Sequence, residues 1–217
     1  MTRKAPLPED VAGVPGLRTI RRGNLRCTIV DLPKGGVCLY SPVEKTVAAL
    51  SETLDVRYLF APNHYHNKGI AEHVDAFRDA KPVGSDAARP RLEKVTGHGF
   101  GDLSQLRDAL PDSISLVEPA GLKTGEVWMV IRAEDELVWV VTDAFCGVLE
   151  KGDARARAGF LKTFPTYGLQ DKQRFSDWVQ QQLAESEPTM ILPCHGEIVR
   201  GSELTREITA LVGALQT

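Results

Sequence analysis

The chain has 217 residues and a formal net charge of −3 at pH 7, with an isoelectric point near 6.0. This mild acidity excludes the strongly basic surface of proteins that bind nucleic acid or anionic membranes. No stretch approaches the ~20 apolar residues of a membrane span, and the N-terminus lacks the apolar region of a signal peptide. We therefore expect a cytoplasmic protein that acts on a small molecule.

The four cysteines indicate a reducing environment rather than a disulfide framework. They are widely separated and form no Cys-x-x-Cys pair. We expect them to be buried free thiols.

The first half of the chain predicts a tail followed by strands and helices. Residues 1–16 are rich in proline and are expected to be a loosely packed tail, and residues 17–217 are expected to form a single domain. Alternating apolar residues predict strands, and apolar residues at helical spacing predict helices. The expected elements are a β-meander over 17–40, a helix over 43–54, a strand over 56–61, a helix over 70–77, a strand over 81–84 and a helix over 86–95.

The second half predicts a further sheet with helices. The expected elements are strands over 114–118, 126–132 and 137–142, a helix over 171–184, a strand over 189–192 and a final helix from about Ser202. Strands that alternate with helices, some of them joined by hairpins, indicate an α+β protein with two sheets covered by helices.

Polar side chains follow three of these apolar strands at the point where each strand ends. His64 and His66 follow strand 56–61, Asp143 follows strand 137–142, and His195 follows strand 189–192. Groups carried on the loops after strands can converge on one site. Imidazole and carboxylate groups are usual ligands of zinc, iron or manganese.

Each of these residues also has an ordinary structural interpretation. A single loop histidine is usually solvent-facing or hydrogen-bonded, Asp143 is typical of a turn or helix N-cap, and His195 before Gly196 is typical of a turn. His73 lies beside the apolar stripe of the helix over 70–77, which favours packing. The coincidence of the three clusters favours a functional site.

The order of these motifs resembles the metallo-β-lactamase fold. The resemblance rests on His64-Tyr65-His66 after "VRYLFAPN", Asp143 in "VVTDAF" and His195 in "PCHGE", and it covers the chain from about residue 18 to the end. It implies a four-layer αββα sandwich. It also implies a hydrolase of esters, thioesters, lactones, amides or phosphodiesters that uses one or two metal ions.

The motif departs from the family pattern at three ligand positions. The family loop His-x-His-x-Asp-His has Lys68 and Gly69 in place of its last two residues, and residues 118–125 lack the usual histidine. The resemblance leaves His64, His66, Asp143 and His195, enough by type and number for one divalent metal, with zinc favoured over iron or manganese. In an alternative interpretation no metal binds, and the ammonium of Lys68 forms a buried pair with Asp143.

Two functions stay open from the sequence. The first is a single-metal hydrolase, with Asp143 or Glu197 as candidate general base and His98 as a candidate replacement ligand. The second is a non-catalytic, metal-free protein that binds a small ligand or a protein partner, with Lys68 in place of the metal charge. An unrelated α/β protein with coincidental histidines is the third alternative.

Overall fold

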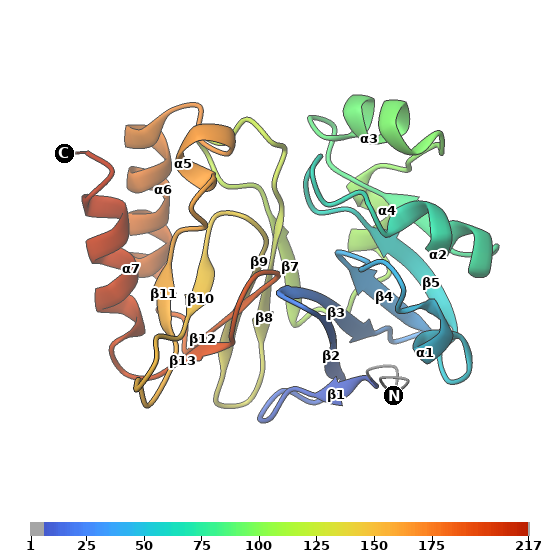
Figure 1. Cartoon of the computed structure of the whole chain (residues 1–217), viewed down its shortest axis with the longest axis horizontal. Coiled ribbons are helices and arrows are strands. Elements are labelled where there is room, and N and C mark those ends of the chain that lie inside the picture. The colour runs from blue at the N-terminus through green and yellow to red at the C-terminus, as the bar shows by residue number, and fades with distance from the viewer. Residues whose placement is uncertain (1–6, 217) are drawn as a thin grey trace. The chain divides into compact units, whose positions relative to one another are not determined.

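The structure is a computed structural model that describes residues 7–216, and its chain forms two compact units, Met1–Asp112 and Ser113–Thr217. Figure 1 labels the helices and strands of both units. Within the described residues, no helix is both long and apolar enough to cross a membrane.

The first unit contains a mixed sheet with strand order β1-β2-β3-β4-β5-β6. Strands β1 to β4 pair antiparallel, and β4, β5 and β6 pair in parallel. The elements are β1 (Glu9–Asp10), β2 (Leu17–Arg22), β3 (Leu25–Asp31), β4 (Val37–Tyr40), α1 (Val47–Ser51), β5 (Val56–Phe60), α2 (Ile70–Ala76), β6 (Lys81–Val83), α3 (Arg89–Thr96) and α4 (Leu103–Arg107).

The core of this unit lies between its sheet and its helices. Leu39 and Leu59 on the central strands pack with Leu50 of α1, Ile70 of α2 and Leu92 of α3, all of which are fully buried. Burial of such side chains is the main stabilising contribution in a domain of this size.

Two details of the first unit differ from the sequence-based expectation. The proline-rich stretch is packed from Glu9 onward, because β1 pairs with β2 and the side chains of Val11 and Val14 are buried; residues 1–6 lie outside the described part. The helix expected over 43–54 begins only at Val47, since Lys45 adopts a left-handed backbone with φ of 62° that a helix does not allow.

The second unit contains a mixed sheet with strand order β13-β12-β9-β8-β7. Strands β8 and β9 form the expected hairpin, and β12 pairs in parallel with β9. The elements are β7 (Ile114–Val117), β8 (Trp128–Arg132), β9 (Leu137–Val141), β10 (Cys146–Val148), β11 (Arg157–Gly159), α5 (Phe164–Tyr167), α6 (Lys172–Glu185), β12 (Met190–Pro193), β13 (Val199–Arg200) and α7 (Leu204–Gly213).

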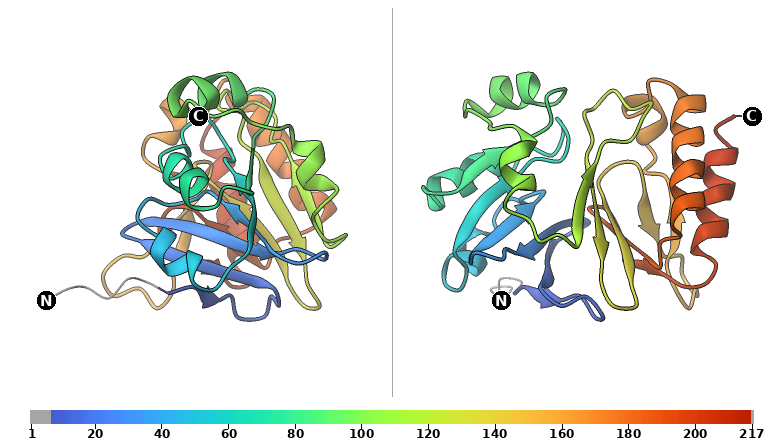
Figure 2. Two further views of the ribbon diagram at one scale, coloured as in Figure 1. Left: turned by 90° about the vertical axis from the view of Figure 1, so that its right-hand side faces the viewer. Right: turned by 180° about the vertical axis from the view of Figure 1, so that it is seen from behind.

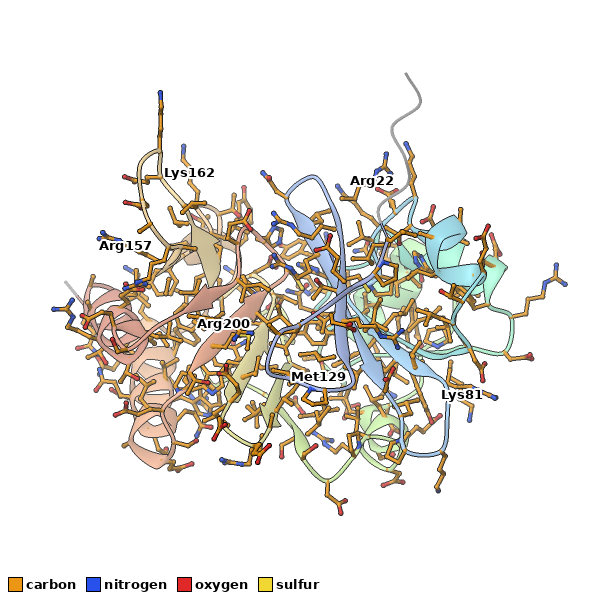
Figure 3. All side chains as sticks on the ribbon, turned by 90° about the horizontal axis from the view of Figure 1, so that it is seen from below. Arg22, Lys81, Met129, Arg157, Lys162 and Arg200 are labelled. Atoms are coloured by element: carbon orange, nitrogen blue, oxygen red, sulfur yellow. The ribbon has the colours of Figure 1, made fainter. Side chains whose placement is uncertain are left out.

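Two long helices cover one face of this second sheet. α6 and α7 run alongside each other, as the orange and red ribbons of Figure 2 show. Their buried side chains, among them Phe175 of α6 and Ile208 of α7, pack against Trp128 and Trp139 of the sheet. Met129 is buried in the interior, whereas Lys162 extends into solvent (Figure 3).

The sheets and helices confirm the α+β class. Each unit contributes one mixed sheet and a set of helices. The cysteines are free and buried as expected, and burial raises the pKa of the Cys38 and Cys146 thiols, so that neither is an activated nucleophile.

Candidate metal centre

Asp143 and His195 form a partly buried pair in the second unit. Asp143 follows β9 and His195 follows β12, and these two strands are parallel with Val141 opposite Pro193. The carboxyl ends of both strands therefore meet at one edge of the sheet. Nε2 of His195 lies 3.1 Å from Oδ1 of Asp143, and the side chains of His195 and Asp143 are 19% and 13% exposed.

Backbone hydrogen bonds hold the two loops of this pair together. The N–H of Gly147 donates to the carbonyl of His195, and the N–H of Glu197 donates to the carbonyl of Gly147, both at 3.1 Å. A Cβ atom at Gly147 would lie 1.8 Å from the carbonyl oxygen of Glu197. Only glycine permits this approach, so the sequence around Gly147 helps to fix the position of His195.

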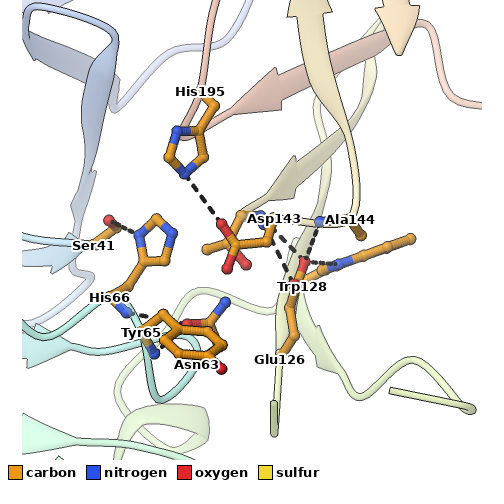
Figure 4. A network of polar contacts seen from close by, with 10 residues as sticks. Ser41, Asn63, Tyr65, His66, Glu126, Trp128, Asp143, Ala144 and His195 are labelled. Atoms are coloured by element: carbon orange, nitrogen blue, oxygen red, sulfur yellow. Dashed lines mark hydrogen bonds and ion pairs between the residues drawn. The ribbon is translucent and has the colours of Figure 1, made fainter. Parts of the chain in front are cut away.

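A buried acidic residue, Glu126, contacts the Asp143 loop. Its side chain is only 2% exposed. Oε1 accepts hydrogen bonds from the indole N–H of Trp128 (2.8 Å) and from the backbone N–H groups of Thr142 and Ala144 (both 3.3 Å). Oε2 accepts from the backbone N–H of Asp143 (3.3 Å), as Figure 4 shows.

Burial raises the pKa of Glu126, and the negative charge of Asp143 raises it further, while the hydrogen bonds from Trp128, Thr142 and Ala144 oppose these two effects. Glu126 begins the strand expected over 126–132, so the strand pattern gives it no functional role. A charged residue at the start of an otherwise apolar run was the available signal.

In the first unit, His64 and His66 share one turn after β5. The buried side chain of Asn63 organises this turn, because its Oδ1 accepts from the backbone N–H groups of Tyr65 (2.8 Å) and His66 (3.0 Å). The ring of His64 meets the ring of Tyr65 edge-on, with centroids 4.3 Å apart.

His66 is oriented by a buried serine of the same unit. Oγ of Ser41 lies 2.6 Å from Nδ1 of His66 (Figure 4). Ser41 has a φ of 57°, a left-handed conformation that costs a non-glycine residue free energy and often marks a functional site. A proton on Nδ1 that bonds to Ser41 leaves the lone pair of Nε2 available to a metal ion.

The residues that depart from the family pattern have different surroundings in the structure. Lys68 is exposed to solvent. An exposed ammonium does not favour the buried ion pair of the metal-free interpretation. A Cβ atom at Gly69 would lie 2.2 Å from the carbonyl oxygen of Pro42, so a histidine does not fit there without a backbone shift. Leu122, in the segment without a histidine, instead forms a β-bridge with Leu169 in the second unit.

The two remaining histidines of the first unit lie elsewhere. His73 on α2 is fully buried, with Nδ1 2.6 Å from the carbonyl oxygen of Gly69 and Nε2 3.2 Å from Oγ1 of Thr46. Its expected packing role is confirmed. His98 lies partly buried in the loop between α3 and α4, and its role as a replacement ligand stays a prediction.

Each unit offers side chains of types that can bind a metal ion. Asp143 and His195 each offer one ligand atom from a partly buried, rigid strand end. His66 has the orienting hydrogen bond that metal-binding histidines usually have. Lys68 and Gly69 stand where the sequence resemblance implies two further ligands.

Comparisons with known proteins identify the fold. The sequence matches no protein-family model and no curated protein. In structure it is similar to the DIM-1 metallo-β-lactamase, with a TM-score of 0.61, 13% identity and coverage of 97% of this chain and 99% of that chain. It is also similar to a metallo-β-lactamase from Pontibacter korlensis, with a TM-score of 0.53, 13% identity and coverage of 96% and 93%.

A third similar structure is the Flv1 flavodiiron core from Synechocystis sp. PCC6803, with a TM-score of 0.61 and 12% identity. The comparison covers 99% of this chain but 63% of that chain, so the chain spans less than two thirds of the flavodiiron core. The chain has the metallo-β-lactamase fold, as its motifs predict, in a strongly divergent form.

Proposed function

We propose that the protein is a single-metal hydrolase of a small ester, thioester, lactone or similar substrate. The observation that carries the proposal is the pair of Asp143 and His195, which is partly buried and is fixed by two parallel strands of the second unit. A carboxylate and an imidazole held in this way form a suitable donor pair for zinc, and also for iron or manganese.

The proposed ligands are His64, His66, Asp143 and His195. The participation of His64 and His66 rests on the sequence motif and on the orientation of His66 by Ser41. When bound, a divalent metal polarises a carbonyl oxygen and lowers the pKa of water. Within the chain, the partial burial of Asp143 and His195 limits the access of bulk water and strengthens electrostatic interactions with a substrate.

Two carboxylates are candidates for the general base. Asp143 is itself part of the site, and Glu197 lies on the same loop as His195, with its backbone held by Gly147. Substitution of Glu197 by glutamine, with metal content and substrate hydrolysis measured together, distinguishes them. Loss of hydrolysis with metal retained assigns the base to Glu197.

Lys68 has a separate predicted role, namely to supply positive charge in place of a second ion. Its exposed side chain makes it easy to test, because Lys68→Ala is not expected to disturb packing. A variant that keeps its metal but loses hydrolysis supports the role, and unchanged hydrolysis contradicts it.

Metal content tests the proposal directly. Protein purified without a histidine tag is analysed by inductively coupled plasma spectrometry, then assayed against ester, thioester and lactone substrates. We expect about one equivalent of zinc, iron or manganese, and its loss in His64→Ala, His66→Ala, Asp143→Ala and His195→Ala. Less than about a tenth of an equivalent after reconstitution contradicts the proposal.

A further inference from the structure

Glu126 has an unusual environment for an acidic residue. It lies just before β8, in the interior of the second unit, at 2% exposure. Burial of a carboxylate is costly unless hydrogen bonds replace the lost water. Here four N–H groups point at its two oxygens, one from Trp128 and three from the backbone.

The three backbone donors are consecutive, and Asp143 is the middle one. The amides of Thr142, Asp143 and Ala144 all donate to the same carboxylate (Figure 4). Three bonds to successive peptide groups fix the backbone on both sides of Asp143. The direction in which the Asp143 side chain leaves the loop is therefore set by Glu126.

Glu126 also limits the freedom of the loop before any ligand arrives. Because its carboxyl group accepts four hydrogen bonds, the Asp143 loop needs little ordering when a cation binds at Asp143. Glu126 could serve only as the acceptor for the buried indole N–H of Trp128. That role would explain one hydrogen bond, but it does not explain the three bonds to the Asp143 loop.

We infer that Glu126 is a positioning residue that holds the Asp143 loop in the geometry for binding a divalent cation and strengthens that binding. The inferred effect of Glu126 on cation binding rests on the proposed metal-dependent function. The inferred effect of Glu126 on the Asp143 loop does not, so the two effects are tested separately.

The informative substitution is Glu126→Gln. The glutamine has nearly the same shape but no charge, and its NH₂ group must replace one acceptor oxygen opposite an N–H donor. The matched control is Glu136→Gln in the same unit. Glu136 is hydrogen-bonded as well, to Arg200 at 2.9 Å and to Thr189, but it is only partly buried. It lies just before β9, whereas Asp143 lies beyond the end of this strand.

The first measurement needs no metal. Amide hydrogen exchange of residues 142–144 is followed by nuclear magnetic resonance in metal-free protein. We expect exchange about tenfold faster or more in Glu126→Gln, and unchanged exchange at these residues in Glu136→Gln. Unchanged exchange in Glu126→Gln overturns the inference, whatever the wild-type protein does with metals.

The second measurement uses Co²⁺ as the probe. We expect Glu126→Gln to bind Co²⁺ about 10- to 100-fold more weakly and with a changed visible absorption spectrum, as for other residues that support metal ligands. Faster exchange with unchanged Co²⁺ affinity and spectrum overturns the metal part and leaves Glu126 as a structural residue. If the wild type binds no Co²⁺, the proposed function fails, while the exchange measurement still decides the role in the loop.

A second variant covers the case in which Glu126→Gln does not fold. Glu126→Asp keeps the charge but shortens the side chain, so the three amides cannot all be reached in the same way. We expect faster exchange at residues 142–144 and weaker Co²⁺ binding than in the wild type. Wild-type exchange in Glu126→Asp contradicts the inference.

Discussion

Oδ1 of Asp143 lies 3.1 Å from Nε2 of His195, although the two residues are 52 positions apart in the sequence. The parallel pairing of β9 with β12 produces this proximity, because it places the ends of both strands at one edge of the sheet. The two donors therefore lie on short loops that are anchored by the ends of two paired strands, and little ordering is required when a ligand binds.

Zinc is expected to stabilise the protein through this pair. A ligand that binds only the folded state at about 100 times its Kd adds about 2.7 kcal/mol to the free energy of unfolding. Thermal unfolding with and without Zn²⁺ should show this increase in the wild type and lose it in Asp143→Ala. The control is Asp177→Ala, on the exposed surface of α6, and an equal increase in all three proteins contradicts the prediction.

Gly69→Ala is expected to destabilise the first unit. The new Cβ atom would lie 2.2 Å from the oxygen and 2.6 Å from the carbon of the Pro42 carbonyl, both backbone atoms that move only with the chain. We expect a loss of about 1–3 kcal/mol in the free energy of unfolding, measured in urea. Gly99→Ala is the control, since no atom lies within 4 Å of its Cβ position. Equal stability of the two variants would show that the turn adapts.

The contrast between the four candidate ligands and the residues Gly69 and Glu126 shows how much the sequence alone can predict. The sequence alone points to the four candidate ligands because each of them follows an apolar strand, which is a local pattern. These ligands are His64, His66, Asp143 and His195. The three backbone partners of Glu126 lie 16 to 18 positions further along the chain, and Pro42 approaches Gly69 from another segment. These are tertiary contacts, which periodicity does not encode.

The predicted length of one helix was wrong for a related reason. The helix expected over 43–54 is limited to α1, because Lys45 adopts a left-handed backbone conformation that the spacing of apolar residues does not reveal. The sheets, hairpin and α6 followed the sequence patterns closely, because each depends on the burial of one regular face.

Substitutions at Ser41 should separate backbone strain from the orientation of His66. Ser41→Gly relieves the left-handed backbone, which costs roughly 1–2 kcal/mol, but removes a hydrogen bond worth about 0.5–1.5 kcal/mol. Its free energy of unfolding should therefore stay near that of the wild type, whereas Ser41→Ala should be about 1 kcal/mol less stable. Both variants should lose the Nδ1 hydrogen bond in the ¹⁵N spectrum of His66 and bind Zn²⁺ more weakly. Wild-type affinity in Ser41→Gly would contradict the orienting role.

His73 is expected to make the stability of the protein depend on pH. Burial lowers the pKa of this imidazole, and the hydrogen bond to the Gly69 carbonyl and the charge of Glu72, 3.7 Å away, only partly oppose the effect. The folded state therefore resists a proton that the unfolded state accepts below about pH 6.5. The free energy of unfolding that depends on His73 is fully present above that pH and falls as the pH drops toward the pKa of His73 in the folded state. For one proton, this free energy falls by at most about 1.4 kcal/mol per pH unit.

Urea unfolding at about pH 7.5 and pH 5.5, on either side of the ordinary histidine pKa, measures this dependence. The matched variant is His73→Gln, which keeps a polar side chain between Gly69 and Thr46 but does not titrate. The wild type should lose more stability than the variant over this interval, because the other histidines contribute equally to both proteins. Equal losses would mean that His73 takes up a proton as readily in the folded state as in the unfolded chain.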